Sequence, residues 1–243
     1  YLLQIQQQLP RDTVLKVGYV GNVGRRLDTT YDYNQPEPGP GAPGPRRPLY
    51  RIAPAVVGVT YNVFDGKSNY HSLQATFERR FAGGLGFITA YTWSHSIDNV
   101  PNAFGGAANG PIPQDRRCRQ CDRASSGFDI RHRLTHSMNW SVPVGRGRKW
   151  SFDSRAMDML LGGWETNLIL TAQTGLPFTP TLQTSVSNAG ASRPDRYKSG
   201  KLQKPDPAYW FDTSFNVPGA AWGVPQIYTF GNAGRNILYG PGR

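Results

Sequence analysis

The sequence predicts an all-β protein, an antiparallel membrane β-barrel fragment of about six long strands with long external loops. Three observations predict it: strand-like alternation of apolar and polar residues, connections that are alternately short and long, and aromatic residues near the ends of the alternating segments. The chain has 243 residues with 28 glycines and 20 prolines, which favours strands joined by turns over helical bundles. No run of about 18 apolar residues occurs, so no transmembrane helix is expected.

The first two predicted strands form a hairpin. Residues 1–9, YLLQIQQQL, and residues 13–20, TVLKVGYV, both alternate, and the turn residues Pro10, Arg11 and Asp12 lie between them. Residues 21–70 include the segment PEPGPGAPGPRRP and are expected to form a long, extended or mobile connection.

A second hairpin is predicted over residues 71–94, HSLQATFERRFAGGLGFITAYTWS, where two alternating runs flank a glycine-rich turn. Its largely apolar face holds Leu73, Ala75, Phe77, Arg79, Phe81, Phe87, Thr89, Tyr91 and Trp93. Its polar face holds Gln74, Thr76, Glu78 and Arg80. Another long loop is expected over residues 98–127.

The clearest strand signal covers residues 130–144. Its even positions are mostly apolar and its odd positions mostly polar, which gives one clean face on a strand but spreads over more than half of a helix. The strand is long enough to cross a bilayer even when tilted. Residues 164–175 form the next predicted strand, after a connection with a helical turn at 157–161, and residues 176–243 are mostly loop.

The connections and the aromatic residues together favour an outer-membrane barrel. The connections run short, long, short, long, medium and long, as when short turns lie on one rim and long loops on the other. Aromatic rings near strand ends are candidates for an interfacial girdle. These are Tyr91, Trp93, Trp140 and Trp164. The alternative is a soluble, secreted all-β binding module, whose apolar faces pack on each other.

The net charge of +11, from 27 Lys and Arg against 16 Asp and Glu, raises the question of nucleic-acid binding. The basic residues form short clusters rather than a long run, so no nucleic-acid partner is expected.

Two cysteines and two histidines come close to a zinc-finger spacing. Cys118, Cys121, His132 and His136 read C-x2-C-x10-H-x3-H, with fewer residues between Cys and His than usual. On a strand the two imidazoles stand about 13 Å apart, so zinc binding requires a helix at 130–138. We interpret the cysteines as a disulfide in an external loop, formed in an oxidising compartment. A zinc-dependent nucleic-acid binder remains the alternative.

No catalytic or cofactor-binding constellation is found. Gly18, Gly21 and Gly24 follow a strand, but no helix follows them to bind a pyrophosphate, so they indicate a strand end and a turn. No G-x-S-x-G motif occurs. The loop aspartates are not dense enough to indicate a calcium site. These are Asp98, Asp115, Asp122 and Asp129. We expect no enzyme activity and no cofactor.

Five segments, in order, resemble the barrel of the Oar-like TonB-dependent outer-membrane receptors of acidobacterial type. They are RDTVLKVGYVGNVGRRL, SNYHSLQATFERRFAGGLGFITAYTWSHSID, FDIRHRLTHSMNWSVPVGRGRKW, LGGWETNLILTAQTGLPFT and YWFDTSFNVP…FGNAGRNILYGPG. The resemblance implies a large barrel with an N-terminal plug, often preceded by a β-sandwich. We therefore expect residues 1–243 to be a piece of such a barrel, without the plug, the sandwich and the last strands.

The resemblance also implies a function and partners. The expected function is ligand-gated transport across the outer membrane, energised by an inner-membrane TonB complex acting through the plug. The apolar faces would meet outer-membrane lipid, and loops 21–70, 98–127 and 176–243 would capture an unknown external ligand. Candidate ligand contacts are Arg116, Arg117, Arg119, Arg123, Tyr209, Trp210, Phe211 and Trp222. For the arginines, contact with lipid phosphates or simple solvation is an equal alternative.

Overall fold

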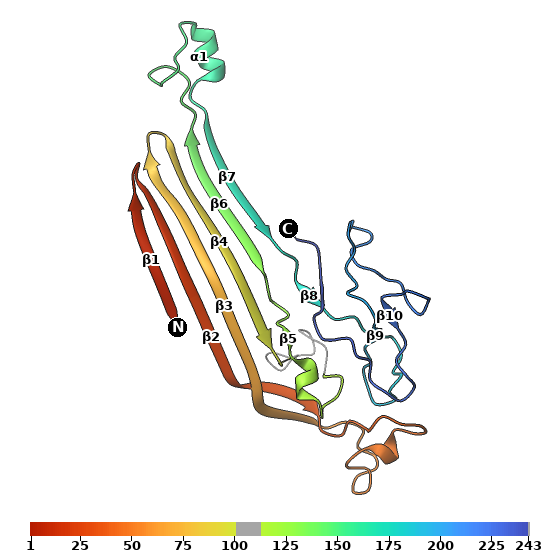
Figure 1. The fold of residues 1–243 in the computed structure, drawn as a ribbon. Helices are drawn as coiled ribbons and strands as arrows, with labels where there is room; N and C mark the ends of the chain where they lie inside the picture. The colour runs from red at the N-terminus through yellow and green to blue at the C-terminus, as the bar shows by residue number, and fades with distance from the viewer. Residues whose placement is uncertain (101–112, 243) are drawn as a thin grey trace.

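The computed structural model describes residues 1–100 and 113–242, so residues 101–112 of the predicted loop 98–127 lie outside the described residues. Six long antiparallel strands form one sheet in chain order (Figure 1). They are β1 (Leu2–Leu9), β2 (Thr13–Asp32), β3 (Thr60–Ala82), β4 (Leu85–Asp98), β6 (His132–Ser141) and β7 (Glu165–Gln173). The short strand β5 (Ala124–Ser125) pairs with the end of β4.

The remaining elements are short. They are the helix α1 (Arg155–Leu161), the 3-10 turns η1 (Gly44–Arg46) and η3 (Arg119–Asp122), and the strand pairs β8 (Pro177–Phe178) with β11 (Leu238–Tyr239) and β9 (Asp195–Arg196) with β10 (Trp222–Gly223). None of the described helices is long and apolar enough to cross a bilayer.

The register places the predicted apolar faces on one side of the sheet. Side chains directly opposite each other on paired strands share a face. One row across the sheet is Leu3, Tyr19, Leu73, Trp93 and His132, and the next is Ile5, Val17, Ala75, Tyr91, Leu134 and Ala172. The faces predicted separately for each strand are therefore one continuous surface.

The opposite face of the sheet is more polar. A row across it is Gln4, Gly18, Gln74, Thr92, Arg133 and Gln173. On the same face the Lys16 ammonium pairs with the Glu78 carboxylate at 3.2 Å. The sheet therefore separates an apolar surface from a polar one.

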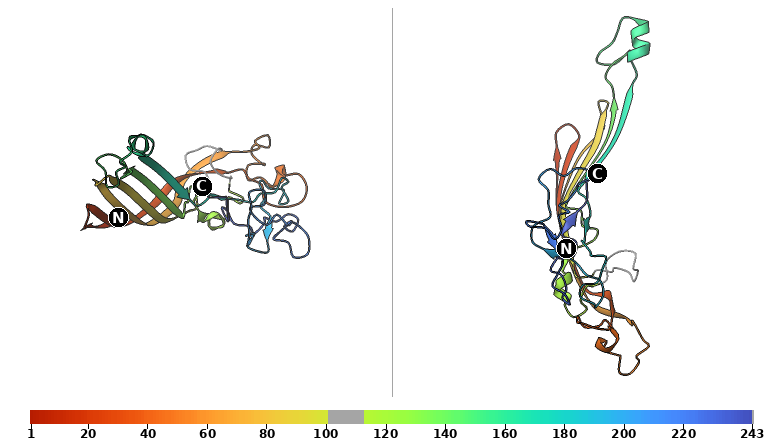
Figure 2. Two further views of the ribbon diagram at one scale, coloured as in Figure 1. Left: turned by 90° about the horizontal axis from the view of Figure 1, so that it is seen from above. Right: turned by 90° about the vertical axis from the view of Figure 1, so that its right-hand side faces the viewer.

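The long strands are a single layer, as the side view in Figure 2 shows. Leu73 is 43% exposed and Trp93 is 54% exposed on the apolar face. The buried apolar cluster lies instead in the C-terminal part of the chain, around Ala221, Trp222, Ala233 and Leu238. Among the described residues, the soluble sandwich alternative therefore lacks the second sheet that it requires.

The distance between the two tryptophan rows on the apolar face is close to the height of the apolar band of an outer-membrane barrel. Trp93 pairs with His132, and Trp140 pairs with Leu85, so eight residue steps separate the two tryptophans along the strands. This is about 26 Å at about 3.3 Å per residue, or about 20 Å when a strand is tilted by about 40°, close to the apolar band of an outer-membrane barrel. Trp164 lies at the Trp140 end because its carbonyl accepts from the amide of Val142.

The two tight turns lie at one end of the sheet, together with the longer connection between β6 and β7, and the other long connections lie at the opposite end (Figure 1). At one end β1 and β2 are joined by Pro10–Asp12, and β3 and β4 by Gly83 and Gly84. Both glycines have positive φ, 60° and 83°, the conformation that a tight two-residue hairpin turn needs. At the other end lie the described residues 33–59, 99–100 with 113–131, and 174–242, which we call the three external segments.

The prediction of one long loop over residues 21–70 is wrong at both ends. β2 continues to Asp32 and β3 begins at Thr60, and their pairing includes Thr29 with Val63 and Tyr31 with Tyr61. The register shifts between Arg25 and Thr29, and Arg26 has a φ of 56°. This bulge interrupts the period-two pattern of the side chains while the backbone pairing continues, so the strand could not be recognised from the sequence pattern.

Candidate ligand-capture site in the external segments

The three external segments form one body, the external cap. Gln35, from the first segment, is buried and donates from Nε2 to the carbonyl oxygens of Gln114 at 2.8 Å and Ala189 at 3.1 Å. Its Oε1 accepts from the amide of Arg116 at 2.9 Å. One side chain therefore joins all three segments.

Gln114 forms a second bridge between the segments. Its Nε2 donates to the carbonyl oxygen of Gly231 at 2.9 Å, and its Oε1 accepts from the amide of Arg193 at 2.6 Å. Both glutamines are buried and hydrogen-bonded to backbone groups. Removing either side chain therefore leaves buried backbone polar groups without hydrogen-bond partners.

Two buried ion pairs complete the cap. Arg193 pairs with Asp122, and Arg235 pairs with Asp98. The side chains are at most 8% exposed. Arg235 also donates to the carbonyl oxygens of Asp122 and Asp98, both at 2.9 Å. Each guanidinium is thus neutralised and hydrogen-bonded, the condition under which a buried charge is tolerated.

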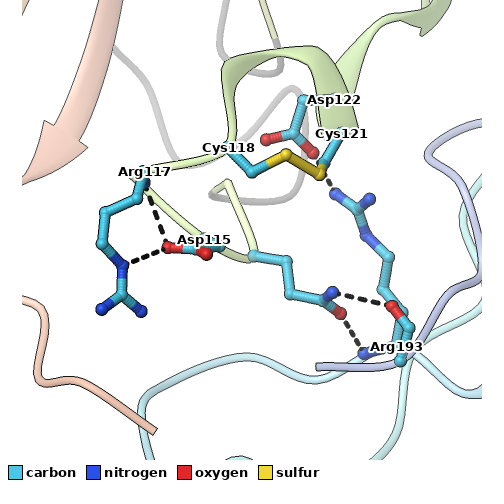
Figure 3. Close-up of a disulfide and its surroundings, with 8 residues drawn as sticks. Asp115, Arg117, Cys118, Cys121, Asp122 and Arg193 are labelled. Carbon is cyan, nitrogen blue, oxygen red and sulfur yellow. Dashed lines mark hydrogen bonds and ion pairs between the residues drawn. A yellow bond between two sulfur atoms is a disulfide. The ribbon is translucent and has the colours of Figure 1, made fainter. Parts of the chain in front are cut away.

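The disulfide lies beside one of these pairs (Figure 3). Cys118 and Cys121 are joined, with their Cα atoms 5.4 Å apart, across the turn η3. Asp122 ends this turn and meets Arg193. The disulfide expected from the sequence is therefore present, and it closes the turn that presents Asp122.

The zinc alternative fails in this structure. His132 and His136 lie on strand β6 rather than on a helix. Their Nδ1 atoms share hydrogen bonds with Tyr91 Oη at 2.7 Å and Thr89 Oγ1 at 2.8 Å. The cysteines are in the disulfide, and the described residues contain no cluster of three or more side chains suited to a metal.

Three of the four candidate arginines make internal contacts. Arg119 makes a bidentate pair with Asp65, at 2.9 and 2.7 Å, and stacks 4.3 Å over the ring of Tyr31. Burial lowers the pKa of Arg119, against the field of Asp122. Arg117 pairs with Asp115 at 2.9 Å and Glu37 at 3.2 Å.

Arg116 and Arg123, the remaining candidate arginines, differ in exposure; Arg116 is the third with an internal contact. The Arg116 guanidinium lies 5.5 Å from the centre of the Tyr33 ring. Arg123 is exposed, and its side chain makes no ion pair with any described residue. Arg123 is thus the most available cation of this turn.

The four candidate aromatic residues also separate. Tyr209 is exposed, Trp210 donates from Nε1 to the carbonyl oxygen of Tyr239 at 2.6 Å, and Phe211 packs edge-on against Phe178. Trp222 is only 4% exposed and forms the centre of the buried cluster. Trp222 therefore stabilises the cap, and its prediction as a ligand contact is wrong.

Two cavities border these residues. One of about 870 Å³ lies where the cap meets the apolar face, with Tyr91, Leu134, Trp210 and Phe211 in its walls. The other, of about 150 Å³, is lined by all three external segments and includes Tyr31 and Arg116.

The smaller cavity offers hydrogen-bond donors. Tyr31 Oη and Arg116 Nε are buried and have no hydrogen-bond partner among the described residues. Unpaired donors of this kind suit an oxygen acceptor such as a carboxylate or a water molecule.

Sequence reasoning missed the residues that build the cap. The contacts of Gln35, Gln114, Arg193 and Arg235 join residues 71 to 154 positions apart. The only local signal was the series of loop aspartates, two of which, Asp98 and Asp122, neutralise these arginines.

The open antiparallel sheet, with an exposed apolar face, tight turns at one end and three long segments at the other, defines a membrane β-barrel protein. The family model for the outer membrane beta barrel domain matches residues 1–243, and the chain belongs to this family. Its place is therefore the bacterial outer membrane. No curated protein and no solved structure matches the chain. The described strands are an open part of a barrel, since β1 and β7 are not paired with each other.

Proposed function

We propose that this chain is part of a TonB-dependent receptor of Oar-like type that takes up an external ligand. The observation that carries the proposal is the external cap, in which three long segments are held together by buried side chains at one end of a barrel sheet. A passive barrel does not need such a structure, whereas a receptor needs a surface that keeps its shape for a ligand. The resemblance of five ordered segments to such receptors supports the same function.

In this proposal the apolar face contacts outer-membrane lipid and the polar face lines the lumen. The exposed cap residues Arg123 and Tyr209 make the first contacts with the ligand, and Arg116 lies at the smaller cavity. Trp210 and Phe211 line the larger cavity, which borders the lipid-facing surface. An inner-membrane TonB complex supplies energy through the plug. The chain has no catalytic role, cofactor or nucleic-acid partner in this account.

The test compares uptake by three strains. Wild-type cells, cells without the receptor gene and cells without TonB are grown in the same complex medium, and the compounds remaining in each medium are measured by mass spectrometry. We expect at least one compound that wild-type cells deplete and both mutants leave. If loss of the receptor changes no compound, or if the compound is depleted without TonB, the proposal is wrong.

A further inference from the structure

The connection between β6 and β7, residues 142–164, is much longer than the other two at the short-turn end. It projects beyond the strand ends and carries α1 (Figures 1 and 2). It is folded, because the Arg146 amide donates to Asp158 Oδ1 at 2.6 Å and the Gly163 amide donates to the Val144 carbonyl at 3.2 Å. We call this segment the rim connection.

One side of α1 is apolar and uncovered. Met157, Leu160 and Leu161 are 45%, 70% and 47% exposed. At about 100° per residue they lie within an arc of about 100°, and Met159 lies on the other side of the helix with Arg155. No residue of α1 is buried against the described part of the chain.

This apolar side continues the apolar face of the sheet. The Trp164 indole donates from Nε1 to the carbonyl oxygen of Leu160 at 3.0 Å. Trp164 precedes β7 and shares its alternation with Leu168, on the face that carries Trp140. The exposed surface of α1 therefore begins where the lipid-facing surface of the sheet ends.

The rim connection is also basic. It holds four cationic residues, Arg146, Arg148, Lys149 and Arg155, against two acidic ones, Asp153 and Asp158. All four cationic side chains are exposed. Lys149 lies 5.4 Å from the ring centre of Trp150. Basic groups beside exposed apolar and aromatic groups are typical of segments that lie in a membrane interface.

We propose that the rim connection binds the periplasmic leaflet of the outer membrane, with Met157, Leu160, Leu161 and Trp164 among the acyl chains and the cations Arg148 and Lys149 at the phosphates of anionic phospholipids. The length of the connections orients this end of the barrel towards the periplasm. Lipid is favoured over a protein partner because the apolar side is continuous with a surface that already contacts lipid. The segment anchors the rim and fixes its depth in the bilayer.

The test places a single fluorescent label on each side of α1. Both native cysteines are in the disulfide, so Met157→Cys and Met159→Cys each provide one reactive thiol for an environment-sensitive dye. The full-length protein is reconstituted into nanodiscs of phosphatidylethanolamine and phosphatidylglycerol, with or without lipid that carries a nitroxide quencher on its acyl chain. The label at 157 loses emission to the quencher lipid and is protected from iodide, whereas the matched label at 159 remains open to iodide.

A charge variant tests the contribution of the cations. Arg148→Gln and Lys149→Gln together reduce the ratio of lipid-bound to water-exposed label at 157 by about fivefold per cation. In nanodiscs of phosphatidylcholine alone the wild-type protein shows the same reduction. Folding is checked by the gel mobility of the unheated barrel.

Two results overturn the proposal. One is a label at 157 that remains open to iodide and unaffected by the quencher lipid in every nanodisc. The other is a label that becomes protected only when a periplasmic extract is added, which assigns the surface to a protein. A charge variant with unchanged quenching overturns the assignment of the cations to phosphates.

Discussion

Among single residues, Asp122 has the largest predicted effect on the external cap. Its carboxylate neutralises the buried Arg193, and its carbonyl accepts from Arg235. We expect Asp122→Asn to leave the Arg193 charge without a counterion and to destabilise the cap by about 3–5 kcal/mol. Limited proteolysis of the protein in lipid, followed by identification of the cut sites, measures this effect.

The matched control is the next residue in the same turn. Arg123 is exposed, so Arg123→Gln changes cap stability by less than about 0.5 kcal/mol. Equal protease resistance of Asp122→Asn and the wild-type protein would show that the buried pair does not hold the cap together.

The turn at Asp212 is predicted to weaken in acid. Hydrogen bonds from the Ser214 side chain and amide hold the pKa of Asp212 below its ordinary value of 3.8. A carboxyl whose pKa is lowered on folding contributes stability that is complete above the unfolded pKa and is lost as the pH falls through the folded pKa.

Hydrogen exchange of the Ser214 amide, which donates to Asp212 at 2.9 Å, measures this loss. Protection is constant at neutral pH and falls only below the ordinary pKa. Ser214→Ala moves the loss to higher pH. A protection that is independent of pH in acid contradicts the assignment.

Among the elements, the strands are predicted to tolerate charge on one face only. Phe77 lies on the apolar face halfway between the rows of Trp93 and Trp140, and Thr76 lies on the opposite face. We expect Phe77→Arg to cost about 2–4 kcal/mol in a bilayer, and Thr76→Arg to cost much less. Urea-induced unfolding in lipid vesicles measures both, and Phe77→Ala separates the lost packing from the added charge. Equal losses of stability for Phe77→Arg and Thr76→Arg would contradict the assignment of one face to lipid.

The sequence predicts most elements of the sheet, for a physical reason. β6 alternates between an apolar and a polar face, and β4 and β7 keep the same pattern except for Ile88 and Ile169, which lie on the polar face. The positions of these strands and their faces therefore follow from the period-two pattern. The outer halves of β2 and β3 could not be predicted, because the bulge at Arg26 and the polar sequence around Asn62 remove the pattern.

The external cap could not be predicted in the same way. The disulfide follows from the spacing of Cys118 and Cys121, but Gln35 and Arg193 have no local feature that marks them as buried. Their positions depend on partners far away in the sequence. This is also why Trp222, which the sequence suggests as a surface aromatic, lies in the buried cluster.

In the whole molecule, sheet and cap are expected to respond separately to reduction. The disulfide closes a loop of a few residues, and its loss destabilises the cap by roughly 2 kcal/mol in the chain-entropy estimate. The strands have no contact with either cysteine in their ladders. Hydrogen exchange with and without a reductant should show faster exchange near Asp122 and Arg193, and no change in residues 72–81 of β3 and 85–94 of β4, which lie away from the cap. Faster exchange in the strands would show that cap and sheet unfold together.

The central claim is that one face of a single-layer sheet contacts lipid. The most direct test is a spin-label scan of residues 133–140 on β6 in the full-length protein in nanodiscs. The account predicts frequent collisions of the spin label with oxygen, which dissolves in lipid, at the even positions 134, 136, 138 and 140. At the odd positions between them it predicts rare collisions. A scan without this period of two, or with the odd positions in lipid, would contradict the account.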